Sequence, residues 1–294
     1  MRGPMFKTNL VSDLPNLAKI MDSNLVNPWG VSHSATSPFW VSDQNKNVST
    51  LYNVTSSGVT KNALTLTVPT TATGPQGPTG QVNNNTSAFS VNGTPASFIF
   101  ANLNGTISAW NNIPTGNTTA AIEATTAGAV YTGLAISSGP FLYAANGAQN
   151  RIDVFNGSFA NVTSTVFAGK FVDPALPAGL VPFNVQNIGS NIFVTYAPAG
   201  GRPNQIHVPE GVGAVAEFDA NGNFVTQLIA GSKLASPWGI TLAPADFGPF
   251  GGDLLVANFS FDASEINAFN LSTGCSTARF RSTTVATVLA GFGP

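Results

Sequence analysis

Five related segments recur along the chain at steps of 50, 53, 51 and 55 residues. They read "NPWGVS" from Asn27, "GPTGQV" from Gly77, "VYTGLAIS" from Val130, "VPFNVQNIG" from Val181 and "SPWGITLA" from Ser236. A period of about fifty residues indicates an array of similar supersecondary units, because each unit buries its faces only against its neighbours.

Each segment is followed by three more segments that favour strands. The second strands read "FWVSDQN", "FIFANLN", "FLYAANG", "IFVTYAP" and "LLVANFS", and the third read "STLYNV", "TISAWN", "RIDVFN", "AVAEFD" and "EINAFN". A looser fourth strand reads "NALTLTVP", "AAIEATT", "STVFAG" or "NFVTQLIAG". We therefore expect an all-β chain folded as a β-propeller of four-stranded antiparallel blades. The alternative, a β-sandwich, gives no reason for the same four-strand order to repeat five times.

We expect residues 1–294 to form one propeller domain, with blades that start near residues 27, 77, 130, 181 and 236. Residues 6–14 read as an additional outer strand that closes the last blade. A sixth repeat would fall near residues 286–290, where the sequence reads "ATVLAGFGP". Two architectures stay open: five complete blades, with residues 6–14 and 277–291 sharing the closing blade, or six blades with an incomplete last one.

The composition limits the partners and the location of the chain. Only 8% of the residues are charged, the net charge is −2, and no run of Lys or Arg occurs, so the footprint of nucleic-acid binding is absent. No segment has the roughly 18 apolar residues of a membrane span. A surface of Asn, Thr, Ser and Gly favours an extracellular or periplasmic protein, although "MRGPMFKTNL" has no signal-peptide core. We expect a monomer. An internal disulfide cannot form, since Cys275 is the single cysteine.

The recurring pattern Pro-x-Gly followed by an apolar residue, then "VSD" or "VAN", then "IDVFN" or "INAFN", resembles the NHL-type and gluconolactonase-like bacterial propellers. It also resembles a group of uncharacterised secreted bacterial propellers with "NPWG" near the start. The gluconolactonase-like resemblance implies a calcium ion held by carboxylate and amide oxygens, which polarises a lactone carbonyl, and a carboxylate that serves as general base. The present chain offers fewer acids at these positions.

Propeller geometry places two sets of side chains at one face, before the inner strands and after the second strands. The candidate calcium ligands after the second strands are Asp43, Asn102, Asn146 and Asn258, with Asp262 close by. These are oxygen donors of the kind that Ca²⁺ prefers. Asn27, Asn184 and Tyr196 are candidate substrate-binding residues. The alternative is that Asp and Asn stabilise the turns that follow the strands.

The longest interruption of the repeat reads "APAGGRPNQIHVPEGVG", between the second and third strands of the fourth unit. It carries Arg202, His207 and Glu210, the candidate catalytic residues. A histidine or a glutamate can act as general base, and an arginine can stabilise an oxyanion. The alternative is an exposed loop whose polar residues have no function. His33, the other histidine, is expected to be structural.

These observations favour a calcium-dependent hydrolase that opens lactone rings, with sugar lactones or N-acyl-homoserine lactones as substrates. The alternative is a non-catalytic propeller that binds a protein or a glycan, which the scarcity of acids favours. A lyase or glycosidase needs two carboxylates about 5–10 Å apart, and only Asp43 stands out. No serine-hydrolase elbow, zinc-protease motif or phosphate-binding loop occurs.

Overall fold

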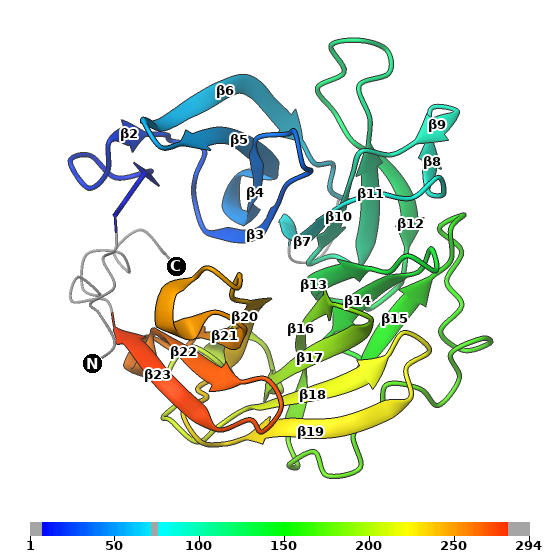
Figure 1. The fold of residues 1–294 in the computed structure, drawn as a ribbon. Coiled ribbons are helices and arrows are strands. Elements are labelled where there is room, and N and C mark those ends of the chain that lie inside the picture. Colours follow the sequence, from blue (N-terminus) through cyan, green and yellow to red (C-terminus); the bar gives the residue numbers. More distant parts are fainter. Residues whose placement is uncertain (1–7, 72–75, 282–294) are drawn as a thin grey trace. The chain divides into compact units, whose positions relative to one another are not determined.

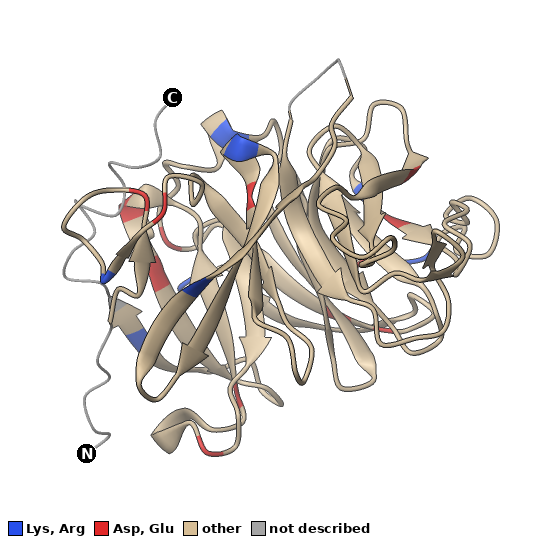
Figure 2. Cartoon of the chain, turned by 90° about the horizontal axis from the view of Figure 1, so that it is seen from above, with Lys and Arg blue, Asp and Glu red and all other residues tan. Residues whose placement is uncertain are grey.

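The protein is a five-bladed β-propeller built of antiparallel sheets (Figure 1), as the repeat predicted. The structure, a computed structural model, describes residues 8–71 and 76–281. Within these ranges the only helices are four short 3-10 turns, and none is long and apolar enough to cross a membrane. Figure 2 shows how thinly the charged residues are scattered over the sheets.

Each blade starts with an inner strand, and the strands then follow in chain order. The first blade consists of β3 (Pro28–Ser32), β4 (Phe39–Asp43), β5 (Val48–Thr55) and β6 (Gly58–Thr67), and the second of β7 (Pro78–Asn83), β10 (Phe98–Asn102), β11 (Thr106–Trp110) and β12 (Ala121–Thr125). The third consists of β13 (Tyr131–Ile136), β14 (Leu142–Asn146) and β15 (Arg151–Phe155). The fourth consists of β16 (Leu180–Ile188), β17 (Asn191–Pro198), β18 (Ala214–Asp219) and β19 (Phe224–Ala230), and the fifth of β20 (Pro237–Leu242), β21 (Asp253–Asn258), β22 (Glu265–Asn270) and β23 (Ser276–Arg281).

The fourth strand predicted for the third blade, residues 164–169, is wrong, because this segment forms turns. Its aromatic side chains turn inward instead: Phe167 and Phe171 are buried and stack with ring centroids 6.1 Å apart. Phe171 also packs on Phe218 of β18, and its backbone N–H donates to the carbonyl of Gly222. Packing against the fourth blade thus replaces strand pairing.

The closing strand predicted at residues 6–14 is also wrong in its described part. Val11–Ser12 (β1) pairs in parallel with Ile20–Met21 (β2), and the fourth strand of the last blade is β23. Asp22, next to β2, accepts hydrogen bonds from Tyr52 of β5 and Lys61 of β6, which attach this segment to the first blade. Residues 6–7 and 282–294, including "ATVLAGFGP", lie outside the described residues.

The described chain divides into two compact units. The N-terminal unit comprises residues 8–144 and 153–162, with the first two blades and most of the third. Trp40 of β4 stacks on Phe98 of β10 at 4.1 Å and packs against Trp110 of β11, which fills the space between the first two blades. Large aromatic side chains supply much of the apolar burial that holds neighbouring blades together.

The C-terminal unit comprises residues 145–152 and 163–281, with the fourth and fifth blades. Its core is apolar and is shared by β17, β18, β21 and β22, with Phe193, Val215, Val256 and Phe269 all buried. The inner strands β16 and β20 lie next to each other. This packing fixes the long loop of residues 199–213 beside the loop that joins β21 to β22.

Candidate functional site

The C-terminal unit brings together two residues that are 55 positions apart in the chain. His207 Nδ1 lies 3.0 Å from Asp262 Oδ1, and both side chains are more than half exposed, 63% and 54%. A carboxylate on one imidazole nitrogen fixes the ring tautomer, so that Nδ1 carries the proton and Nε2 accepts one. The pair therefore has the arrangement in which His207 Nε2 can accept a proton as a general base.

Backbone contacts attach the His207 loop to the loop after β21. Ser260 Oγ accepts a hydrogen bond from Val208 N at 2.9 Å and donates to Val208 O at 2.7 Å. The N–H of Phe261 donates to the carbonyl of Ile206 at 2.8 Å. The Phe261 ring stands edge-on to His207, with centroids 5.8 Å apart. These contacts flank His207 on both sides and hold it next to Asp262.

Glu210 is arranged as an ion-pair partner. Its carboxylate lies 3.0 Å from Lys233 Nζ and 2.8 Å from Arg279 Nη2. The hydrogen bond from Lys233, followed by that from Arg279, holds the pKa of Glu210 below its usual range. A carboxylate with a lowered pKa is a weak base, so the geometry favours His207 over Glu210 for proton abstraction. Arg202 starts the short 3-10 helix η2 (Arg202–Asn204) and is exposed on the same loop.

Asp43, in the N-terminal unit, is a buried carboxyl group with one engaged oxygen. Its Oδ2 accepts a hydrogen bond of 2.7 Å from Thr50, and its Oδ1 has no hydrogen-bond partner among the described residues. Burial raises the pKa of Asp43 to about 8, and the nearby Asp22 adds to this effect, whereas the Thr50 hydroxyl opposes it. Such a group is neutral at neutral pH unless a cation pairs with it.

Asn102 is another buried polar side chain of this unit without hydrogen-bond partners among the described residues. Neither its Oδ1 nor its Nδ2 is hydrogen-bonded within the described chain. Asn102 pairs with Pro78, and a Cβ on the preceding Gly77 would lie 1.9 Å from the carbonyl oxygen of Gln44, the residue after Asp43. The fold thus places Asn102 and Gln44, the residue after Asp43, next to the start of β7.

Asn146 and Asn258 are engaged in local structure. Asn258 Oδ1 accepts from Ala235 N at 3.0 Å, and its Nδ2 donates to the carbonyls of Lys233 and Ala263. Asn146 exchanges hydrogen bonds with Gln149, through Gln149 N at 3.2 Å and Gln149 Oε1 at 3.0 Å. These contacts match the turn-stabilising alternative, while their role as metal ligands stays a prediction.

The predicted substrate-binding residues lie at strand starts or in the sheets. Asn27 has a positive φ of 51° before Pro28 and donates to the side chain of Gln44. Asn184 donates to the carbonyl of Trp238 at 2.7 Å. Tyr196 is buried, its hydroxyl has no partner among the described residues, and burial raises its pKa. The contacts of Asn27 and Asn184 and the burial of Tyr196 belong to the fold itself, and the role of the three residues in substrate binding stays a prediction.

The sequence did not single out Ser260, Lys233 or Arg279, and it indicated Glu265 only as an acid near Asn258. Arg279 lies in "CSTARFRSTT", a segment whose sequence departs from the repeat. This departure was the one feature of the sequence that could have drawn attention to Arg279. The four residues become relevant only because the fold brings β22, β23 and the turn before β20 to the loop of His207 and Glu210.

The chain is similar to three uncharacterised proteins of Acanthamoeba polyphaga mimivirus. The identities are 30%, 29% and 28%, over 89%, 60% and 85% of this chain. The chain spans 66%, 33% and 67% of the lengths of these relatives. No protein-family model matches the chain. The sequence relatives are therefore viral and carry no assigned activity.

Solved structures support the propeller fold. A protein from Lactobacillus plantarum matches with a TM-score of 0.53 and 13% identity, over 87% of this chain and 71% of that one. A chain of a nidogen/laminin complex matches with a TM-score of 0.54 and 10% identity, over 89% and 82% of the two chains. A gluconolactonase from Xanthomonas campestris has a TM-score of 0.43 and 16% identity, over 62% and 57%, which is too distant to indicate an activity.

Proposed function

We propose that the chain is a hydrolase that opens lactone rings, with His207 as the general base. The observation that carries the proposal is the 3.0 Å contact between His207 Nδ1 and Asp262 Oδ1 on an exposed loop. A histidine oriented by a carboxylate recurs in hydrolytic sites on unrelated folds. Sugar lactones and N-acyl-homoserine lactones are the substrate classes to test.

The proposed reaction uses groups of this chain alone for proton transfer. His207 Nε2 accepts a proton from water, and the water oxygen attacks the lactone carbonyl carbon. The ring C–O bond then breaks, and the imidazolium returns the proton to the departing alkoxide. Asp262 stabilises the imidazolium between the two steps, and the Arg202 guanidinium can stabilise the developing oxyanion.

Calcium, which the resemblance implies, fits the N-terminal unit in part. Asp43 Oδ1 and Asn102 Oδ1 are buried oxygens without a hydrogen-bond partner among the described residues, and a hard cation takes such donors. A calcium site takes six to eight oxygens in total, and no group of three or more His, Cys, Asp or Glu side chains suited to a metal occurs within the described ranges. Asp43 and Asn102 would hold the ion, which when bound supplies Lewis acidity.

The direct test measures hydrolysis of glucono-δ-lactone and N-hexanoyl-homoserine lactone by the wild type, His207→Gln and His33→Gln. His33 is the matched control, because it is the other histidine of the chain and its ring contacts Ser34 and Phe39. We expect His207→Gln to lose about 10²–10⁴-fold in kcat, the usual contribution of a general base, and His33→Gln to retain it. Equal activities of the two variants would overturn the assignment of His207.

The calcium proposal has a separate readout. Calorimetric titration with Ca²⁺ should detect binding to the wild type and none to Asp43→Asn, while the exposed Asp246→Asn keeps the wild-type affinity. Binding that survives in Asp43→Asn would remove Asp43 from the ligand set, whatever the lactone assay shows.

A second candidate function is glycan binding without catalysis. Four amide residues of the N-terminal unit are linked by hydrogen bonds through their side chains and the Gln76 backbone carbonyl: Asn27, Gln44, Gln76 and Asn104. Amide groups both donate and accept, as sugar hydroxyls require. Titration with maltohexaose and chitohexaose checks this function. Binding that is lost in Gln44→Ala, without lactone turnover by the wild type, would favour it over the hydrolase.

A further inference from the structure

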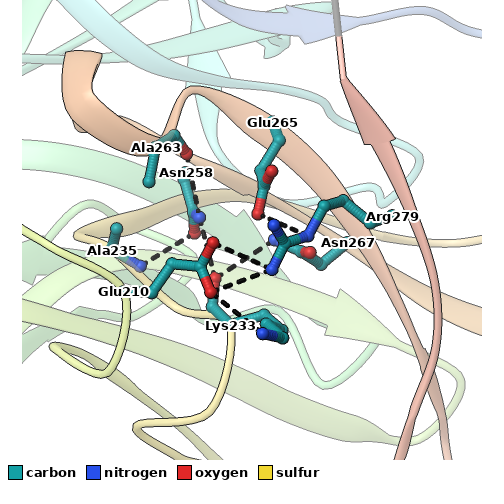
Figure 3. Close-up of polar contacts among 8 residues, drawn as sticks. All are labelled: Glu210, Lys233, Ala235, Asn258, Ala263, Glu265, Asn267 and Arg279. Atoms are coloured by element: carbon teal, nitrogen blue, oxygen red, sulfur yellow. Dashed lines mark hydrogen bonds and ion pairs between the residues drawn. The ribbon is translucent and has the colours of Figure 1, made fainter.

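Arg279 of β23 contacts two carboxylates at once (Figure 3). Its Nη2 lies 2.8 Å from Glu210 Oε1 and 2.9 Å from Glu210 Oε2, and its Nε lies 3.1 Å from Glu265 Oε1. Glu265 is almost fully buried at 2% exposure. The planar guanidinium is suited to such bridging, which a lysine ammonium reproduces poorly.

Lys233 adds a second cation to Glu210. Its Nζ lies 3.0 Å from Glu210 Oε2, in the turn between β19 and β20. The backbone of this turn is itself fixed, because Asn258 and Asn267 both donate to the carbonyl of Lys233, at 2.9 and 3.2 Å. Glu210 is therefore held from two directions by parts of the chain that are fastened to the fifth blade.

Glu210 comes three residues after His207 in the same loop. The amides of the two residues that follow Glu210 are also hydrogen-bonded: Gly211 N and Val212 N donate to Leu234 O at 2.9 and 3.0 Å. The segment that presents His207 is thus attached at one end by Ser260 and at the other by Glu210. At this second end, the ion pairs of Glu210 with Lys233 and Arg279 add charged contacts to the backbone hydrogen bonds.

We propose that Arg279 is a positioning residue, which together with Lys233 and Glu210 holds the His207 loop against the fifth blade. The proposal rests on the proposed function of His207. Single exposed ion pairs contribute little, but a shared Arg fork in a network of partly covered charges has the geometry that makes such pairs effective. Because these charges are partly exposed, salt weakens the attachment.

As a consequence, the contact between His207 and Asp262 depends on ionic strength and on the contacts of Arg279 in β23. When the network is broken, the loop opens more often, and His207 spends less time beside Asp262. A substitution that lowered only the overall stability would raise hydrogen exchange in the loop no more than in the rest of the unit. Local hydrogen exchange separates the two, since it reports local opening independently of turnover.

The test compares Arg279→Met, Arg279→Lys and Glu210→Gln in the full chain, with Lys170→Met as control. Lys170 is a charged residue of the same unit whose ammonium donates to Asn223. We expect Arg279→Met and Glu210→Gln to raise amide exchange at Val208, Gly211 and Val212 by tenfold or more. Arg279→Lys should have an intermediate effect, and Lys170→Met none. Raising NaCl to about 1 M, where the Debye length is about 3 Å, should produce the same rise in the wild type and in Lys170→Met, which keep the network, and little further rise in Arg279→Met or Glu210→Gln.

Activity provides a second readout. The kcat on the lactone that the wild type hydrolyses should fall with the loop opening across the series, while the Lys170→Met value stays unchanged. Exchange at the three amides equal to that of the wild type in both Arg279→Met and Glu210→Gln would overturn the proposal. If Arg279→Met does not fold, Glu210→Gln decides alone. A wild type without lactonase activity refutes the hydrolase, and the exchange data still decide whether the network holds the loop.

Discussion

Asp262 Oδ1 lies 3.0 Å from His207 Nδ1, and the two residues come from loops of different blades. Ser260 and Phe261 make the backbone contacts that keep the two loops together. The orientation of His207 therefore depends on its neighbour in the fifth blade as well as on its own loop.

Asp262→Asn should lower the kcat of the lactonase by up to about 10⁴-fold, the loss seen when the carboxylate that orients a catalytic histidine becomes an amide. The amide still contacts Nδ1 but cannot stabilise the imidazolium. The measurement is the initial rate of lactone opening from pH 5 to 9. Asp246→Asn, in an exposed loop of the same unit, is the control and should leave the profile unchanged.

Asp43 should make the stability of the protein fall as the pH rises. Its pKa is raised by burial to about 8 in the folded state, from 3.8 as its ordinary value. Between these values the folded state binds the proton and the unfolded state has lost it, so the contribution of Asp43 is complete below about pH 4 and is lost towards pH 8. The slope is about 1.4 kcal/mol per pH unit for one proton.

Urea unfolding of the wild type and of Asp43→Asn between pH 5 and pH 8 checks this sign. The wild type should lose stability relative to the variant as the pH increases. Parallel dependences of the two proteins would show that Asp43 ionises normally in the folded state.

Gly77→Ala should destabilise the protein more than Gly93→Ala. Both glycines have positive φ, 99° and 80°, but a Cβ at Gly77 meets the Gln44 carbonyl oxygen, while one at Gly93 meets nothing within 4 Å. Backbone strain alone costs about 1–3 kcal/mol at either position. The excess loss at Gly77, measured by urea unfolding, reports the clash between the starts of the first two blades. Equal losses would contradict the close approach.

Trp40→Ala should cost about 3–5 kcal/mol of unfolding free energy, as is usual for a buried aromatic side chain. Trp40 is 3% exposed and contacts Phe98 and Trp110 of the second blade. Val54→Ala, at an exposed position of β5, serves as control and should change stability by less than about 0.5 kcal/mol. A similar loss in both variants would show that the blades do not depend on this contact.

Most of the fold could be predicted from the sequence, because a repeat of about fifty residues indicates an array of similar four-stranded units, although it left five and six blades open. All five inner strands start within a few residues of the predicted positions. The prediction failed at residues 164–169 and 6–14, where strand-forming residues find other partners. In the first case, Phe167 and Phe171 are buried, and Phe171 packs against Phe218 of the fourth blade, so tertiary packing overrides the strand preference of this segment.

The candidate site could be predicted only as a set of residues. The sequence alone determined the propeller, the low charge and the loop that carries Arg202, His207 and Glu210, since these depend on local patterns and composition. Only the tertiary structure decided that His207 meets Asp262 and that Glu210 is bound by Lys233 and Arg279. It also decided that Asp43 and Asn102 each have a side-chain oxygen without a partner in the described part of the chain. The physical reason is that these contacts join residues from different blades or distant turns, whose distances follow from packing and not from sequence spacing.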